Sequence, residues 1–71
     1  MREYLRKIRQ KKGLSQHTVA KELGICQYYY GMIERMERQK DLDLSLILKL
    51  SKLFDVSVDF IIAEEEKLKA R

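Results

Sequence analysis

The sequence contains little that could cross-link the chain, interrupt it or place it in a membrane. It has one cysteine, Cys26, no proline and three glycines among 71 residues. A lone cysteine cannot form an internal disulfide, and this favours a reducing, cytoplasmic location. The longest apolar run, 60–63, has four residues and is far too short to cross a bilayer. We therefore expect one small domain that depends on helix packing, on a partner subunit or on both.

The sequence also lacks the residue groups that catalysis and cofactor binding require. His17 is the single histidine, and no second ligand lies near it, so it is interpreted as a surface residue and not as a metal ligand. There is no phosphate-cradling glycine loop and no nucleophile with a base at a plausible spacing. We expect neither an enzyme nor a protein that holds a metal or another cofactor.

Charge is unevenly distributed along the chain. Residues 1–40 carry ten Lys or Arg and four acidic residues, a net charge of +6, whereas residues 41–71 carry five and seven, a net charge of −2. A basic half joined to an acidic half is expected if one face binds a polyanion. Simple solvation of helix surfaces would explain the same charges, so composition alone leaves both interpretations open.

Apolar spacing and capping residues divide the chain into five short helices. The first helix is expected to end at Gly13, and the second to begin after Ser15 and end at Gly24. The third is expected from about residue 26 to about residue 35, and the last two after the caps Asp43 and Ser57. The domain is placed at 1–64, and Val58, Ile61 and Ile62 are expected to face inward from its last helix. Residues 65–71 are expected to form a polar tail. The acidic run 64–66, which overlaps this boundary, is interpreted as solvated.

Residues 16–33 carry the pattern of two helices that cross steeply over a tight turn. Ala20 is small where the helix axes would cross, and Gly24 suits the positive φ of the turn. Ile25 would plug the turn into the core, and Tyr30 and Ile33 would seat the helix that follows the turn. The remaining two positions, Val19 and Leu23, are apolar and belong to the inward face of the helix before the turn. Seven matching positions at fixed spacing predict a helix-turn-helix.

On these residues the sequence resembles the phage-repressor and Cro-like helix-turn-helix regulators of bacteria. The resemblance covers roughly residues 5–62 and rests on KKGLSQHTVAKELGI, on the triplet at 33–35 and on LSKLFDVSVDFII. It implies an all-α, five-helix fold like that of the lambda repressor DNA-binding domain. It also implies a transcriptional regulator, in the first place a repressor, that binds double-stranded DNA with its third helix in the major groove.

The resemblance also assigns roles to individual residues. Base contacts are expected from the third helix, and Gln27 is the best reader among them because its amide can pair with adenine. The four residues expected to contact bases are Cys26, Gln27, Tyr28 and Met32. Gln16 is expected against a phosphate at the start of the second helix, where the helix dipole adds partial positive charge. The remaining backbone contacts are expected from Ser15, His17, Tyr29, Arg38 and Lys40.

The third helix and the segment after it include three consecutive tyrosines and several departures from the family. Its three consecutive tyrosines point about 100° apart, so they cannot form one stacking platform; Tyr30 is assigned to the core, Tyr28 to the groove and Tyr29 to a phosphate or to solvent. Cys26 is a poor N-cap, and Gly31 inside the helix should cost about 0.5–1 kcal/mol relative to alanine. The segment 35–43 is about two residues longer than usual and has no glycine.

Assembly and partners are predicted from the last helix and from the third. Phe60 is expected to lie outside the core, about 160° around the helix from Ile62, and the resemblance places dimer contacts near it. We predict a homodimer on a palindromic site, with Phe60 and Ile61 at the contact. The alternative is an antitoxin-like module that binds a protein partner, with DNA binding secondary or lost, because residues 26–34 contain no Lys or Arg.

Overall fold

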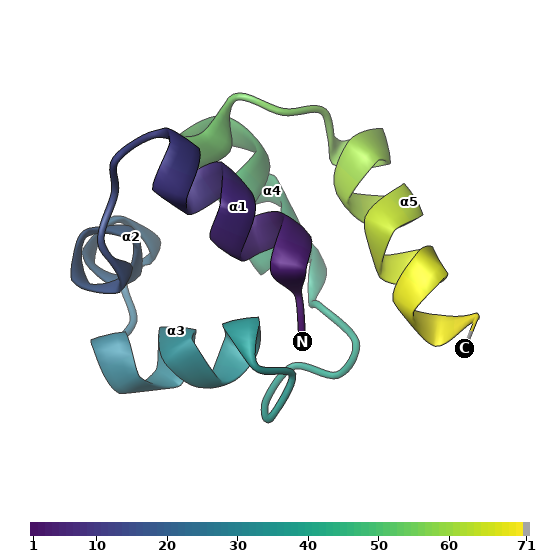
Figure 1. Cartoon of the computed structure of the whole chain (residues 1–71), viewed down its shortest axis with the longest axis horizontal. Coiled ribbons are helices and arrows are strands. Elements are labelled where there is room, and N and C mark those ends of the chain that lie inside the picture. Colours follow the sequence, from purple (N-terminus) through teal and green to yellow (C-terminus); the bar gives the residue numbers. More distant parts are fainter. Residues whose placement is uncertain (71) are drawn as a thin grey trace.

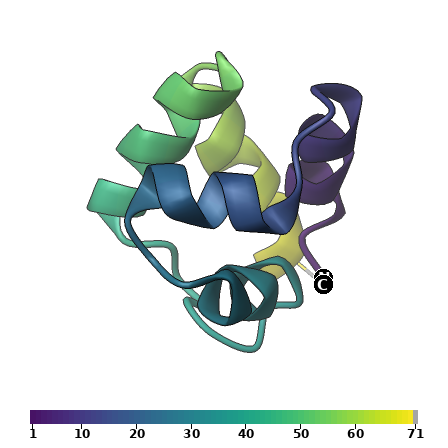
Figure 2. The same ribbon diagram turned by 90° about the vertical axis from the view of Figure 1, so that its left-hand side faces the viewer.

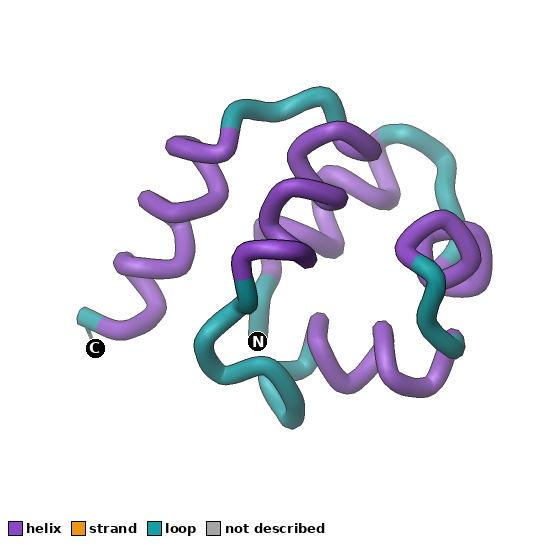
Figure 3. Tube along the Cα trace, turned by 180° about the vertical axis from the view of Figure 1, so that it is seen from behind, coloured by secondary structure: helices purple, strands orange, loops and turns teal. Residues whose placement is uncertain are grey.

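The computed structural model describes residues 1–70, which form five helices and no strand (Figures 1 and 3). In chain order the helices are α1 (Glu3–Lys11), α2 (Gln16–Leu23), α3 (Gln27–Glu34), α4 (Leu44–Phe54) and α5 (Val58–Lys69). The predicted all-α, five-helix fold is confirmed. No helix in residues 1–70 combines the length and apolar character that a membrane span requires.

All five helices contribute to one hydrophobic core. Its fully or almost fully buried apolar side chains are Leu5 from α1, Val19, Ala20 and Leu23 from α2, Tyr30 and Ile33 from α3, Leu46, Leu50 and Phe54 from α4, and Ile61 from α5. Burial of one such large apolar side chain stabilises the fold by about 1.5–3 kcal/mol. Because α2 packs against both α3 and α4, it connects the third helix to the rest of the core.

The predicted caps lie at the expected helix ends. The hydroxyl of Ser15 accepts a hydrogen bond from the Thr18 amide at 3.0 Å, and Asp43 and Ser57 cap α4 and α5 in the same way. Gly24 has a φ of 76°, and the amide of Ile25 beyond it donates to the carbonyl of Ala20. This left-handed closure turns the chain directly from α2 into α3.

The two helices on either side of that turn cross steeply. Figure 1 shows α2 almost end-on while α3 lies across the view, and Figure 2 shows the reverse. Ala20 is 1% exposed, and Tyr30 and Ile33 are buried beneath α3. The helix-turn-helix predicted from the spacing of residues 16–33 is therefore present, with α3 on the outside of the molecule.

The segment after α3 turns without glycine. Met36 has a φ of 61°, and the Glu37 amide closes the helix end by donating to the Met32 carbonyl at 2.8 Å. Gln39 is also left-handed, with a φ of 57°. Such conformations cost roughly 1–2 kcal/mol each for residues other than glycine. The surrounding structure must therefore hold this segment in place.

Arg2 supplies that support from the N-terminus. Its side chain is completely buried, and its Nε and Nη2 atoms donate to the Glu65 carboxylate at 2.9 and 3.0 Å. Nη1 donates to the Ile33 carbonyl at 2.7 Å, and the guanidinium also reaches the carbonyls of residues 38–40. Arg2 thus fastens the end of α3 and the following loop to α5.

The C-terminal part of α5 differs from the predicted polar tail. The helix continues to Lys69, and Glu65 is 8% exposed because it pairs with Arg2 and accepts the Tyr4 hydroxyl at 2.6 Å. Burial and this hydrogen bond raise the pKa of Tyr4 above its usual range. The helix therefore continues past the predicted boundary at residue 64. The interpretation of 64–66 as a solvated run is wrong for Glu65, which is buried. Residue 71 lies outside the described residues.

The inward face of α5 is also narrower than predicted. Ile61 is completely buried, whereas Val58 is half-buried and Ile62 is 41% exposed. The helix presents only one residue of this group fully to the core, so the assignment of Ile62 to the interior is wrong. Because Ile61 is occupied by core contacts, it cannot serve as a dimer contact in this conformation. Phe60 is 39% exposed, and its ring packs in a T-shaped arrangement with the ring of Tyr4.

Candidate nucleic-acid interface

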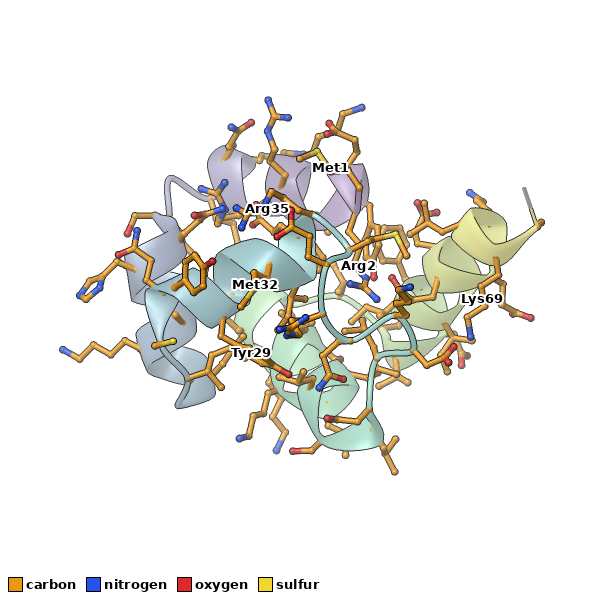
Figure 4. All side chains as sticks on the ribbon, turned by 90° about the horizontal axis from the view of Figure 1, so that it is seen from below. Met1, Arg2, Tyr29, Met32, Arg35 and Lys69 are labelled. Atoms are coloured by element: carbon orange, nitrogen blue, oxygen red, sulfur yellow. The ribbon has the colours of Figure 1, made fainter. Side chains whose placement is uncertain are left out.

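The outer side of α3 is where the residues expected to contact bases are found. Gln27 is exposed, Tyr28 is 72% exposed and Met32 is half-buried. Figure 4 looks onto this side of the molecule, with Met32 and the following Arg35 labelled. Cys26 is exposed at the N-cap, and its side chain makes no capping hydrogen bond, as the sequence predicts. The four residues lie on or beside one accessible helix.

An open cleft of about 390 Å³ joins part of this surface to the start of α2. It is lined by Gln16, Gln27, Tyr28, Gly31 and Arg35. The structure therefore brings the best predicted base reader and the predicted phosphate contact of α2 to the same depression. Met32 and Cys26 do not line this cleft.

A buried carboxylate fixes α2 and α3 relative to each other. Glu34 is 2% exposed and accepts hydrogen bonds from Arg9 Nε at 2.7 Å and from Gln16 Nε2 at 3.1 Å. Burial alone would raise the pKa of Glu34, but the hydrogen bonds from Arg9 and its other neighbours outweigh this and lower it. Burial, together with the same carboxylate, raises the pKa of Tyr30, whose hydroxyl stays neutral. Arg9, on α1, thereby anchors both helices of the motif.

Gln16 belongs to this network through its side-chain amide. Its amide nitrogen is held by Glu34, and its Oε1 atom lies towards Gly31 in the cleft. Ser15 uses its hydroxyl to cap α2, and His17 is exposed beside it. The start of α2 is accessible, but only part of the Gln16 side chain is free to make new hydrogen bonds.

The residues predicted to contact the DNA backbone from α3 and from the loop after it differ in exposure. Tyr29 is half-buried, and its hydroxyl accepts a hydrogen bond from Gln39 Nε2 at 2.8 Å, so it supports the loop and is not simply exposed. Arg38 and Lys40 have exposed side chains, while their carbonyls lie against the Arg2 guanidinium. Arg2 therefore holds the backbone that carries these two cations.

Two arginines at or behind this surface are not marked by the sequence pattern. Arg2 is buried although it stands next to the N-terminus, and no sequence pattern marks its partner 63 residues away. Arg35 lies in the cleft beside Gly31. Here a signal was present, because residues four apart share one face of a helix and a glycine leaves that face open for a long side chain.

Comparison with known proteins agrees with this architecture. Residues 5–61 match the helix-turn-helix family. The HTH-type transcriptional regulator ImmR of Bacillus subtilis (strain 168) is 37% identical over 62 residues, covering 87% of this chain and 47% of ImmR. The SPbeta prophage-derived uncharacterized HTH-type transcriptional regulator YonR, from the same strain, is 40% identical over 60 residues, covering 84% of this chain and 54% of YonR.

The chain spans about half the length of these two relatives. No solved structure matches it significantly. The match over most of the chain agrees with the observed crossing of α2 and α3, with the positive φ at Gly24 and with the accessible outer side of α3. The chain therefore belongs to the helix-turn-helix family, of the phage-repressor and Cro-like type.

Proposed function

We propose that this protein is a transcriptional regulator, acting as a repressor, that binds double-stranded DNA with α3 in the major groove. The observation that carries the proposal is the accessible outer side of α3, where Gln27 and Tyr28 share a cleft with the start of α2. The major groove of B-DNA admits an α-helix, and a glutamine amide can pair with an adenine edge. ImmR and YonR are both named as transcriptional regulators, which supports the same conclusion.

Binding should weaken steeply as salt is added. Each phosphate that Lys or Arg neutralises releases counterions, so log K should fall against log salt with a slope of about −0.9 per phosphate. Fluorescence anisotropy with a labelled duplex, selected from a random DNA pool, measures this slope between low and physiological salt. Failure to bind any duplex in the random pool would contradict the proposal and favour a protein-binding module.

Substitutions should distinguish residues that read the base sequence from residues that position the protein on the DNA backbone. Gln27→Ala should lose roughly 1–3 kcal/mol of binding free energy on the selected site and little on random DNA, since base contacts specify and phosphate contacts position. Gln16→Ala should weaken both duplexes alike. Gln10→Ala, an exposed glutamine on α1, is the matched control and should change neither. Equal losses of Gln27→Ala on both duplexes would refute a reading role for Gln27.

We also propose that two copies bind a palindromic operator, with their α3 helices about 34 Å apart. The contact is assigned to Phe60 and neighbouring exposed residues of α5, because Phe60 keeps 39% of its surface exposed. Phe60→Lys should shift the protein towards monomer in sedimentation at micromolar concentration, whereas Leu48→Lys, on α4, should not. A wild type that is monomeric both alone and on its site would refute the dimer.

A further inference from the structure

We propose that Arg35 binds a backbone phosphate of the DNA and that Glu37 occupies the same guanidinium until the DNA displaces it. This inference rests on the proposed function and adds a residue outside the predicted contact set. It also adds a built-in competitor for the phosphate. Three features support it: the position of Arg35 over α3, the geometry of its ion pair and the absence of Lys and Arg from residues 26–34.

Gly31 lets the Arg35 side chain lie back over α3. A methyl group added at Gly31 would lie 3.2 Å from Arg35 Nη1 and 3.4 Å from Gln16 Oε1. The guanidinium therefore lies where a side chain at position 31 would otherwise be, one helical turn before its own Cα. This places its charge in the cleft with Gln27 and Tyr28. Gly31 weakens the helix but leaves room for the Arg35 guanidinium in the cleft.

The ion pair between Arg35 and Glu37 has the geometry of a phosphate contact. Arg35 Nε and Nη2 donate to the two carboxylate oxygens of Glu37 at 3.1 and 3.2 Å. A guanidinium binds two phosphate oxygens through the same pair of parallel donors. Both side chains are about half exposed, at 41% and 54%, so this pair is screened by water and can be replaced by a stronger anion.

Arg35 also supplies a positive charge that α3 itself lacks. Residues 26–34 contain no Lys or Arg, so the exposed surface of α3 has no cation of its own. Arg35 directly follows α3, and because its side chain lies back over the helix, it places one positive charge on that surface. While Glu37 is bound, this charge is neutralised. DNA that displaces Glu37 therefore gains an ion pair with Arg35. An anion that binds too weakly to displace Glu37 does not gain this ion pair.

The test measures affinity and salt slope for Arg35→Gln, Glu37→Gln and the double variant on the selected and random duplexes. Arg35→Gln should weaken binding to both duplexes by about tenfold, since hydrogen bonds to charged groups are lost, and should reduce the slope by about 0.9. Glu37→Gln should strengthen binding to both duplexes. In the Arg35→Gln background most of that gain should disappear.

Two further variants separate the role of Arg35 from general charge and from folding. Lys67→Gln removes one exposed cation from α5, away from α3, and should have the smaller effect (Figure 1). Gly31→Leu keeps every charge but fills the place of the guanidinium. It should weaken binding in the wild type and much less in the Arg35→Gln background, while circular dichroism shows an intact helical fold.

The outcomes distinguish the inference from the proposed function. If the wild type binds no duplex, the proposed function fails, and this inference fails with it. If the wild type binds but Arg35→Gln behaves like Lys67→Gln, the inference alone is overturned. If Arg35→Gln weakens binding but Glu37→Gln gives the same gain with and without Arg35, Glu37 is not a competitor and the second half of the inference is overturned.

Discussion

Replacement of Arg2 by alanine is expected to remove about 3–5 kcal/mol from the free energy of unfolding. The substitution leaves the buried Glu65 carboxylate without its guanidinium and removes the donor to the Ile33 carbonyl and to the loop carbonyls that follow it. A 71-residue domain is expected to have only roughly 4–11 kcal/mol in total. Urea unfolding followed by far-UV circular dichroism should therefore show a fold that is barely stable or largely lost.

Two variants give this prediction its controls. Arg6→Ala removes an arginine that is 44% exposed and paired with Glu3, and it should change the free energy of unfolding by less than about 1 kcal/mol. Arg2→Lys keeps the charge, but a single ammonium cannot reproduce the fork that binds Glu65 and the carbonyls together, so an intermediate loss is expected. An Arg2→Ala variant as stable as Arg6→Ala would show that this buried pair adds nothing to the fold.

Replacement of Glu34 by glutamine should destabilise the fold strongly at neutral pH and much less in acid. At pH 7 the variant leaves Arg9, whose side chain is 12% exposed, without its anion, and a loss of about 3 kcal/mol is expected. The pKa of Glu34 is lowered in the folded state from an ordinary value of 4.5. Its stabilising contribution is therefore complete above that value and declines as the pH falls through the lower folded pKa.

Unfolding free energies measured from pH 7 down to about pH 3 test this difference. The gap between wild type and Glu34→Gln should narrow as the pH falls below the ordinary value, because the carboxyl group is then protonated in the unfolded wild type while the folded state still holds it charged. It should close once the pH has passed the lower folded pKa. Glu37→Gln, which alters an exposed, water-screened ion pair, is the control and should leave the unfolding curves almost unchanged. A gap that stays constant over this range would mean that the charge of Glu34 is not what stabilises the fold.

Local features of the sequence determined the five helices and the motif. Ser15, Asp43 and Ser57 act through the amides three residues later, and Gly24 acts through its own φ angle. These interactions join residues close in the chain, so a pattern of residue types contains the information needed. For the same reason Tyr30 could be assigned to the core and Tyr28 to the surface from helical geometry alone.

Only the tertiary structure decided which charged residues are buried and what they hold. Arg2 and Glu65 both look like solvated residues near the chain ends, and they meet because α1 and the end of α5 pack beside the loop after α3. Ile61 and Ile62 are neighbours of one residue type, yet only the first faces the core. A long-range contact forms only when separate elements pack at a particular angle, and the spacing of residues within each element does not specify that angle. The position of Arg35 over Gly31 depends on this packing as well, because the start of α2 forms the other wall of its cleft.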